Sequence, residues 1–187
     1  QFGVFPRTNI PTRFENFKQY KNLIDNYIAS DTIKKPRQIW WKIRPHMDFG
    51  TIEFRICDVQ RSLKNVEMLT AICQALVYQS SIDLDNKCLS ESFNMEYLND
   101  GLWKAARFPF NIKMIDPETN SVCTLEYQVN KMKTYIQDAL MYWGNDHINE
   151  YIDFILKNGT EGDDQIKVYK DSGFEKLKIF LMKSVEY

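Results

Sequence analysis

The sequence lacks the features that mark several large classes of protein. Its 24 Lys and Arg residues nearly balance 25 Asp and Glu residues, so no bulk charge recruits nucleic acid or an anionic membrane. No window approaches the ~20 consecutive apolar residues of a membrane span, and no secretory or transit segment is visible. We therefore expect a protein that binds neither nucleic acid nor a membrane.

Cysteine is also scarce. The chain has 4 cysteines, which are far apart and lack the paired CxxC spacing of zinc or thiol-redox sites. Disulfides are rare in the reducing cytoplasm, where unpaired thiols persist. We expect reduced, structural thiols in a cytoplasmic protein.

Length and hydrophobic periodicity predict one α+β domain covering residues 1–187. Apolar residues recur every three or four positions in several segments, which is typical of amphipathic helices. The expected helices cover residues 14–30, 62–77, 91–108 and 126 to the end, with breaks near 144–145, 158–159 and 172–173. A turn at residues 116–120 predicts a hairpin between 112 and 125.

Residues 38–58 carry the strongest functional signal, because their pattern predicts two short antiparallel strands. Ile52, Phe54 and Ile56 alternate with Glu53 and Arg55, the period-2 pattern of a half-buried strand. We expect the three apolar side chains to be buried against the helix that follows. The carboxylate and the guanidinium then project together from the opposite face.

The preceding strand has the same alternation, with Ile39 and Trp41 on its apolar face. If the two strands pair through the connection at residues 47–50, their polar faces coincide. The resulting charged patch contains Lys42, Arg44, His46, Glu53 and Arg55.

This charged patch has two interpretations. Half-solvated antiparallel strands commonly carry polar residues outward, where Arg and Glu form cross-strand ion pairs with no further role. Alternatively, a carboxylate among several cations suits phosphoryl chemistry, because Mg²⁺ requires carboxylate oxygens and the transferring phosphoryl group needs cations. The pattern alone leaves both interpretations open.

Several motifs favour the second interpretation. They are FPRTNIP near the start, IWWKIRP and GTIEFRICD in the two strands and, more weakly, WKAARF at 103–108 and the DPETN turn. Together they resemble the carboxylate-amine ligases of the type 2 glutamate–cysteine ligase family, which is related in fold to glutamine synthetase. The resemblance implies an antiparallel sheet with a concave active face packed on helices, as in glutamine synthetase and the guanidino kinases. It also identifies the chain as the C-terminal half of such a catalytic domain.

The resemblance implies roles for particular residues. Glu53 is similar to the glutamate that holds Mg²⁺ near the nucleotide phosphates, and Arg55 to a residue that binds the substrate carboxylate or the transferred phosphoryl group. Arg44 of the IRP motif is expected to act as a second phosphoryl clamp. Substrate or nucleotide binding is expected at His46, Thr51 and Arg107. The chain departs from the family at Lys42, where Asp is usual, which reverses a charge on the proposed face.

The implied reaction is a two-step ligation that uses ATP and Mg²⁺. ATP phosphorylates the γ-carboxylate of glutamate, and the amine of cysteine or of another small molecule then displaces phosphate. The expected partners are these substrates, the N-terminal half of the same protein and a second copy in a homodimer. Two alternatives remain: a guanidino-type phosphotransferase, which forms ADP without a new amide, and a non-catalytic structural or partner-binding module.

Overall fold

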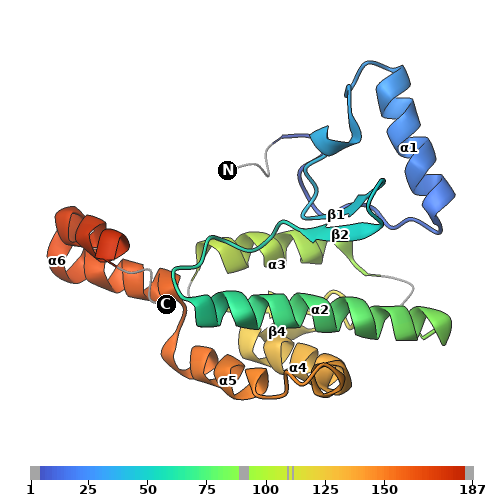
Figure 1. Ribbon diagram of the computed structural model, residues 1–187. Helices are drawn as coiled ribbons and strands as arrows, with labels where there is room; N and C mark the ends of the chain where they lie inside the picture. Colours follow the sequence, from blue (N-terminus) through green and yellow to red (C-terminus); the bar gives the residue numbers. More distant parts are fainter. Residues whose placement is uncertain (1–4, 89–92, 109, 111, 184–187) are drawn as a thin grey trace. The chain divides into compact units, whose positions relative to one another are not determined.

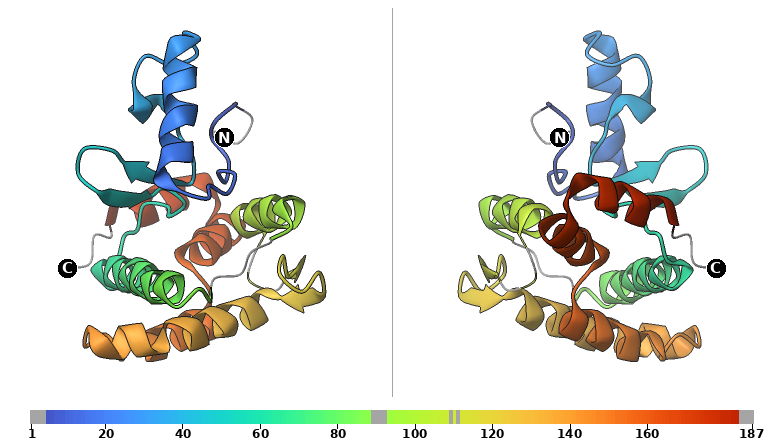
Figure 2. Two further views of the ribbon diagram at one scale, coloured as in Figure 1. Left: turned by 90° about the vertical axis from the view of Figure 1, so that its right-hand side faces the viewer. Right: turned by 90° about the vertical axis from the view of Figure 1, so that its left-hand side faces the viewer.

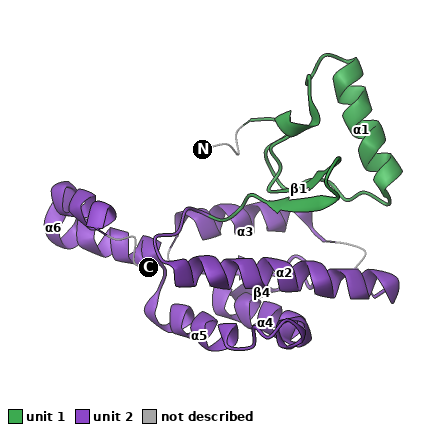
Figure 3. Ribbon diagram, viewed as in Figure 1, with its two compact units in different colours: residues 1–57 green, residues 58–187 purple. Residues whose placement is uncertain are grey.

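The computed structural model describes residues 5–88, 93–108, 110 and 112–183. The chain divides into two compact units, Gln1–Cys57 (unit 1) and Asp58–Tyr187 (unit 2), each with its own core (Figure 3). In the described ranges the fold is α+β, with two small antiparallel sheets and a helix-rich C-terminal part, which confirms the predicted class. That the units form one domain stays a prediction.

Unit 1 is built around one long helix and one hairpin. Its elements are α1 (Phe17–Ala29), the short 3₁₀ helix η2 (Pro36–Gln38), β1 (Ile43–His46) and β2 (Thr51–Phe54) (Figure 1). The side chain of Asn16 caps α1 by accepting a hydrogen bond from the Gln19 N–H at 3.0 Å. The apolar face of α1 packs on the chain that leads into β1, forming a core of Tyr20, Ile24, Ile33, Ile39 and Trp41.

The two strands of unit 1 differ in how well their predicted apolar faces are buried. Ile39 and Trp41 are 1% and 7% exposed, as predicted. Ile52 and Ile56 are 46% and 57% exposed, so their predicted burial is wrong, and Phe54 is only half-buried. The sheet has two strands in the described residues, and a two-stranded ribbon is too narrow to bury a face by itself.

Unit 2 is mainly helical. Its elements are α2 (Leu63–Asp85), α3 (Met95–Arg107), β3 (Lys113–Ile115), β4 (Val122–Thr124), α4 (Leu125–Tyr142), α5 (Ile148–Asn158) and α6 (Glu161–Lys183). Helix α2 packs along α4 and also contacts α5 (Figures 1 and 2). The core between these three helices consists of Ala71, Ala75, Ile136, Ala139, Leu140, Ile148 and Ile152.

Helix α2 begins as predicted, because the Ser62 side chain accepts a hydrogen bond from the Lys64 N–H at 3.2 Å. Its buried face is centred on Ala71 and Ala75, whose small side chains suit close packing. Ile72 and Leu76 of the predicted apolar stripe pack against this core, whereas Val66 and Val77 are exposed. The 3.6-residue period therefore predicted the helix correctly, but it predicted a buried face that is rotated from the observed one.

The predicted helix breaks in the C-terminal part are confirmed. Helix α4 ends at Tyr142, α5 ends at Asn158, and α6 bends at Gly173, where φ is +75°. This left-handed conformation costs glycine little but strains other residues. No helix in the described ranges has the length and apolar character that a membrane crossing requires.

Candidate functional site

The hairpin of unit 1 brings most of the predicted site residues onto one short ribbon. β1 and β2 pair antiparallel, with Arg44 opposite Glu53 and His46 opposite Thr51. The connection at residues 47–50 is a turn in which Gly50 has a φ of +61°, and the Gly50 N–H donates to the His46 carbonyl at 3.2 Å. The predicted pairing and turn are confirmed.

Arg44 is more enclosed than its charged neighbours Glu53 and Arg55, with its side chain 14% exposed against 44% and 31%. Its Nη1 donates to the carbonyls of Arg37 at 2.7 Å and Ile39 at 3.0 Å. Its Nη2 forms an ion pair with Oε2 of Glu53. Arg44 is therefore held on two sides, by the backbone around η2 and by the facing strand.

Tyr20 supports the same strand from the core of unit 1. Its hydroxyl donates to the Pro45 carbonyl at 3.2 Å, which ties β1 to α1. Burial raises the pKa of Tyr20, and the nearby charge of Arg44 offsets part of that increase. The sequence assigned Tyr20 only to the apolar face of a helix, so this contact was not predicted.

Arg55 lies on the same face but is held more loosely. Its Nη1 is 3.5 Å from Oε1 of Glu53, and its side chain is 31% exposed. Its backbone N–H donates to the Lys42 carbonyl at 2.8 Å, which fixes the main chain just beyond β2. The predicted clustering of Arg44, Glu53 and Arg55 is therefore confirmed, while their chemical roles stay predictions.

His46 and Thr51 close the hairpin next to its turn. The His46 ring stacks on Phe49, with centroids 4.4 Å apart and planes inclined by 19°. Its Nδ1 accepts a hydrogen bond from the Asp48 N–H at 3.3 Å, and Thr51 is exposed. These contacts give His46 a local role at the turn; substrate binding by either residue stays a prediction.

Arg107 belongs to unit 2, where it is the last residue of α3. The side chain is exposed, and its Cζ is 5.9 Å from the centroid of the neighbouring Phe108 ring. Its predicted role in nucleotide binding stays a prediction.

The residues around Glu53 do not by themselves make a magnesium site. Both carboxylate oxygens contact arginines, and Mg²⁺ requires a near-octahedral set of oxygen ligands. Across the described ranges, no group of three or more His, Cys, Asp or Glu side chains is placed to hold a metal ion. Glu53 offers one carboxylate, so its predicted role as a metal ligand requires donors from other residues.

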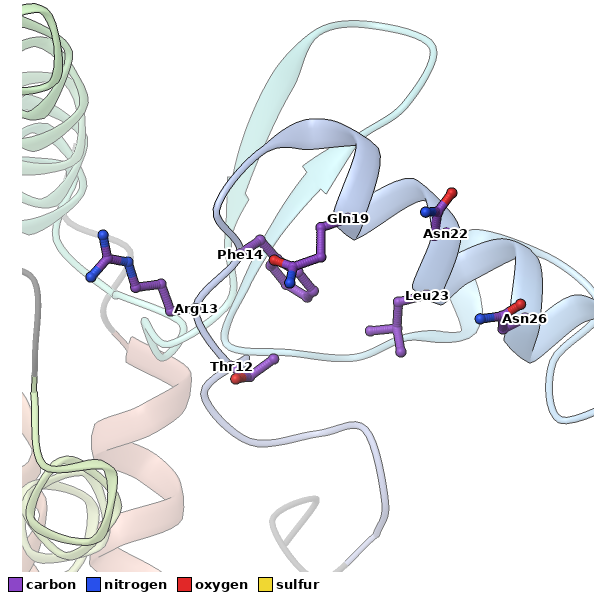
Figure 4. A pocket seen from close by; sticks show the side chains of 7 residues that line it. All are labelled: Thr12, Arg13, Phe14, Gln19, Asn22, Leu23 and Asn26. Carbon is purple, nitrogen blue, oxygen red and sulfur yellow. The ribbon is translucent and has the colours of Figure 1, made fainter.

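A shallow hollow of about 380 Å³ also lies in unit 1, and none of its lining residues belongs to the hairpin (Figure 4). It is formed by α1 and the segment before it, and its lining consists of Thr12, Arg13, Phe14, Gln19, Asn22, Leu23 and Asn26. The Gln19 side chain already accepts a hydrogen bond from the Glu15 N–H at 2.8 Å. Figure 4 shows the Arg13 side chain extending away from α1, so the charged group does not converge with the amides.

A further polar cluster, which the sequence analysis missed, lies at the start of α2. The Glu161 carboxylate accepts hydrogen bonds from the Arg61 and Ser62 N–H groups at 3.1 to 3.2 Å and from the Asn65 side chain at 2.9 Å. Tyr151 donates to Asn65 at 2.6 Å. These partners are up to 100 residues apart in sequence, so no local pattern connects them.

The face formed by Arg44, Glu53 and Arg55 is suited to anionic ligands, since two guanidinium groups and one carboxylate leave a net positive charge. The planar forks of the two arginines match the geometry of a phosphoryl or carboxylate group. Residues 1–177 match the sequence profile of the Glutamate-cysteine ligase family 2 (GCS2), and the chain belongs to this family.

Related curated proteins agree with this assignment. The protein named "Putative glutamate--cysteine ligase 2" from Solibacter usitatus is 28% identical over 100% of this chain and 49% of its own length. Proteins of the same name from Gloeobacter violaceus and Herpetosiphon aurantiacus are 32% and 27% identical, over 91% and 92% of this chain and 46% and 45% of their own lengths. The chain thus spans about half the length of the curated relatives it matches.

Proposed function

We propose that this protein is part of an ATP-dependent carboxylate-amine ligase that forms a γ-glutamyl amide, with cysteine as the amine acceptor. The observation that carries the proposal is the shared face of Arg44, Glu53 and Arg55 in a chain that belongs to the GCS2 family. The name shared by the relatives, "Putative glutamate--cysteine ligase 2", supports the choice of substrates.

The reaction consists of two displacements. An oxygen of the glutamate γ-carboxylate attacks the γ-phosphorus of ATP, and the bond to the bridging oxygen breaks to release ADP. The neutral amine then attacks the carbonyl carbon of the acyl phosphate, loses a proton and expels inorganic phosphate. The glutamate γ-carboxylate, ATP and the acyl phosphate are all anionic. Cationic donors that offset this negative charge therefore lower the barrier.

The hairpin supplies such donors on a main chain that the hydrogen bond from the Arg55 N–H to the Lys42 carbonyl holds in place. Arg55 has a planar fork of N–H groups that matches the two oxygens of a carboxylate or a phosphate. Among the residues that the structure describes, the Arg55 side chain contacts Glu53 alone, at 3.5 Å, so most of these donors are available. Donors that are positioned before the substrate arrives lower the activation barrier more than their charge alone would, because little reorganisation accompanies the reaction.

The proposal includes ATP and Mg²⁺ as cofactors and assigns the remaining metal and substrate ligands to residues outside the described ones. Its support is the single carboxylate of the hairpin face and the half-length match to the relatives. Isothermal titration of the 187-residue chain with Mg-ATP should therefore show weak or no binding. Tight, stoichiometric binding would contradict a divided site.

The direct test is glutamate-dependent release of ADP in the presence of cysteine, with the amide product identified by mass spectrometry. The protein is assayed together with the segment that provides the other half of a family member. Glutamine, which lacks the γ-carboxylate, serves as the matched control and should release no ADP. ADP without an amide would indicate a phosphotransferase instead, and no ADP at all would contradict the ligase.

A further inference from the structure

We propose that the two arginines of the hairpin face have different tasks: Arg55 binds the anionic group of the substrate, whereas Arg44 is a positioning residue that acts through Glu53. This inference rests on the proposed function and adds a division of labour to it. It also revises the expectation that both arginines clamp the phosphoryl group.

The first argument is how the donors of Arg44 are used. Its Nη1 bridges the carbonyls of Arg37 and Ile39, and its Nη2 pairs with Glu53. A guanidinium has five N–H donors in a rigid plane, so these contacts fix both the position and the orientation of the group. With a side chain only 14% exposed, Arg44 has little surface for a ligand to reach.

The second argument is the rigidity of what holds Arg44. Ile39, which provides one of the carbonyls, is 1% exposed in the core of unit 1, and Trp41 is 7% exposed. On the other side, Tyr20 holds the carbonyl of Pro45, the residue that follows Arg44. Moving Arg44 toward a ligand would break its hydrogen bonds to both carbonyls and its ion pair with Glu53 together.

The third argument is the contrast with Arg55. Arg55 is 31% exposed, and its contact with Glu53 is 3.5 Å long, beyond the range of a strong charge-assisted hydrogen bond. An incoming carboxylate or phosphate offers two oxygens to the same fork and can replace that weak contact. Arg55 is therefore the arginine that can exchange a protein partner for a ligand.

Glu53 links the two arginines. It lies directly opposite Arg44 in the strand register, so the Arg44 contact determines where the carboxylate points. The other oxygen of that carboxylate faces Arg55. A change at Arg44 should therefore reach the substrate by displacing Glu53.

A double-mutant cycle tests this route, because two residues that act through one another have non-additive effects. Arg44→Lys keeps the charge but loses the fork that joins two carbonyls to Glu53. We expect it to lower kcat/KM for glutamate by about tenfold in the wild-type background, less than the ~10²-fold that a misplacement of about 1 Å can cost, because the charge is kept. In the Glu53→Gln background the same substitution should have almost no further effect. An equal fold-change in both backgrounds would overturn the proposal, because Arg44 would then act independently of Glu53.

A second measurement does not depend on activity. Phenylglyoxal modifies accessible arginines, and mass spectrometry of the digested protein reports each one separately. Arg55 should react faster than Arg44, and inorganic phosphate should protect Arg55 while leaving the exposed Arg37 unprotected as the internal control. Faster reaction of Arg44, or phosphate protection of Arg44 and not of Arg55, would overturn the assignment.

The two measurements separate the two proposals. If the assembled protein releases no ADP with glutamate and cysteine, the ligase is contradicted, and the modification experiment still decides which arginine binds an anion. If ADP and amide form but the cycle is additive, the ligase stands and the positioning role of Arg44 fails. Thermal melts of each variant exclude unfolding as the cause of a lost rate.

Discussion

Two hairpins in the described part of the chain each place a carboxylate next to cationic side chains, but they differ in how exposed that carboxylate is. In the β1–β2 hairpin, Glu53 is 44% exposed and lies between Arg44 and Arg55. At the β3–β4 turn, Asp116 is 0% exposed, and Lys131 donates to it at 3.0 Å. Asp116 also accepts hydrogen bonds from the N–H groups of Glu118 at 2.8 Å and Thr119 at 3.1 Å.

The difference lies in what remains available to a ligand. Asp116 is fully buried, with its hydrogen bonds satisfied by the turn and its charge by Lys131 of α4, so it fastens the hairpin to α4. Glu53 and Arg55 are partly exposed and joined by a weak contact. Opposite charges on a hairpin therefore indicate a site only where exposure and unused donors accompany them.

The largest expected effect is on catalysis, from Glu53→Gln. The substitution keeps the size of the side chain but removes the charge that contacts both arginines. Loss of one preorganised electrostatic group lowers kcat by about 10² to 10³ in well-studied cases, and we expect a decrease of that scale. The measurement is glutamate-dependent ADP release by the assembled protein, together with a thermal melt.

Glu118→Gln is the matched control for this experiment, because it makes the same chemical change in the other hairpin. It should leave kcat unchanged. Full activity of Glu53→Gln would contradict a role for this carboxylate in the reaction. Lost activity accompanied by unfolding would favour the interpretation of the face as a structural ion-pair network.

The second prediction is a loss of stability without a loss of catalytic rate. Asp116→Asn keeps the shape of the side chain but removes the charge that Lys131 faces, and it weakens hydrogen bonds that involve a charged group. Such bonds contribute about 1.5 to 3 kcal/mol, so we expect a loss of about 2 to 3 kcal/mol in the free energy of unfolding, measured by urea denaturation. The catalytic rate of the folded fraction should not change; a lower kcat without lower stability would contradict the structural role.

The third prediction concerns pH. Burial raises the pKa of Asp116, but hydrogen bonds from Lys131 and from the Glu118 and Thr119 N–H groups outweigh it and lower the pKa from 3.8 to about 2. Because the folded-state pKa is the lower one, the stabilisation is fully present above about pH 4 and is lost as the pH falls through about 2. The difference in unfolding free energy between wild type and Asp116→Asn should therefore shrink over this window. A difference that stays constant from pH 5 to 2 would contradict the lowered pKa.

Sequence periodicity predicted the helices and hairpins better than it predicted which segments pack against them. The helix breaks and both hairpins follow from glycines, turn residues and apolar spacing, all of which act locally. Ile52 and Ile56 show the limit, because alternation identifies an apolar face but not what covers it. Similarly, the buried face of α2 is centred on alanines, which contribute little to an apolar stripe.

The candidate site shows the same division. Strand alternation correctly placed Arg44, Glu53 and Arg55 on one face, because side chains in a strand alternate with period 2. The two carbonyls that hold Arg44 depend on the path of the chain around η2, which no residue pattern specifies. Exposure, which separates Arg44 from Arg55, is likewise a property of the folded unit.

The smallest expected effect comes from Glu118→Gln, measured as stability rather than rate. Glu118 binds Lys131 at 2.6 Å, which is shorter than the Asp116 contact, and its hydrogen bond is the main reason that the pKa of Lys131 is raised. The contact distance alone would therefore rank Glu118 above Asp116 in its contribution to stability.

However, Glu118 is 41% exposed and Lys131 is 38% exposed. Ion pairs in that environment contribute about 0.2 to 1 kcal/mol, because water solvates the separated charges almost as well. Lys131 also keeps Asp116 as a partner in the variant. We expect a loss of about 0.5 kcal/mol in urea denaturation; a loss as large as that of Asp116→Asn would show that contact length, and not burial, determines what a carboxylate contributes to this hairpin.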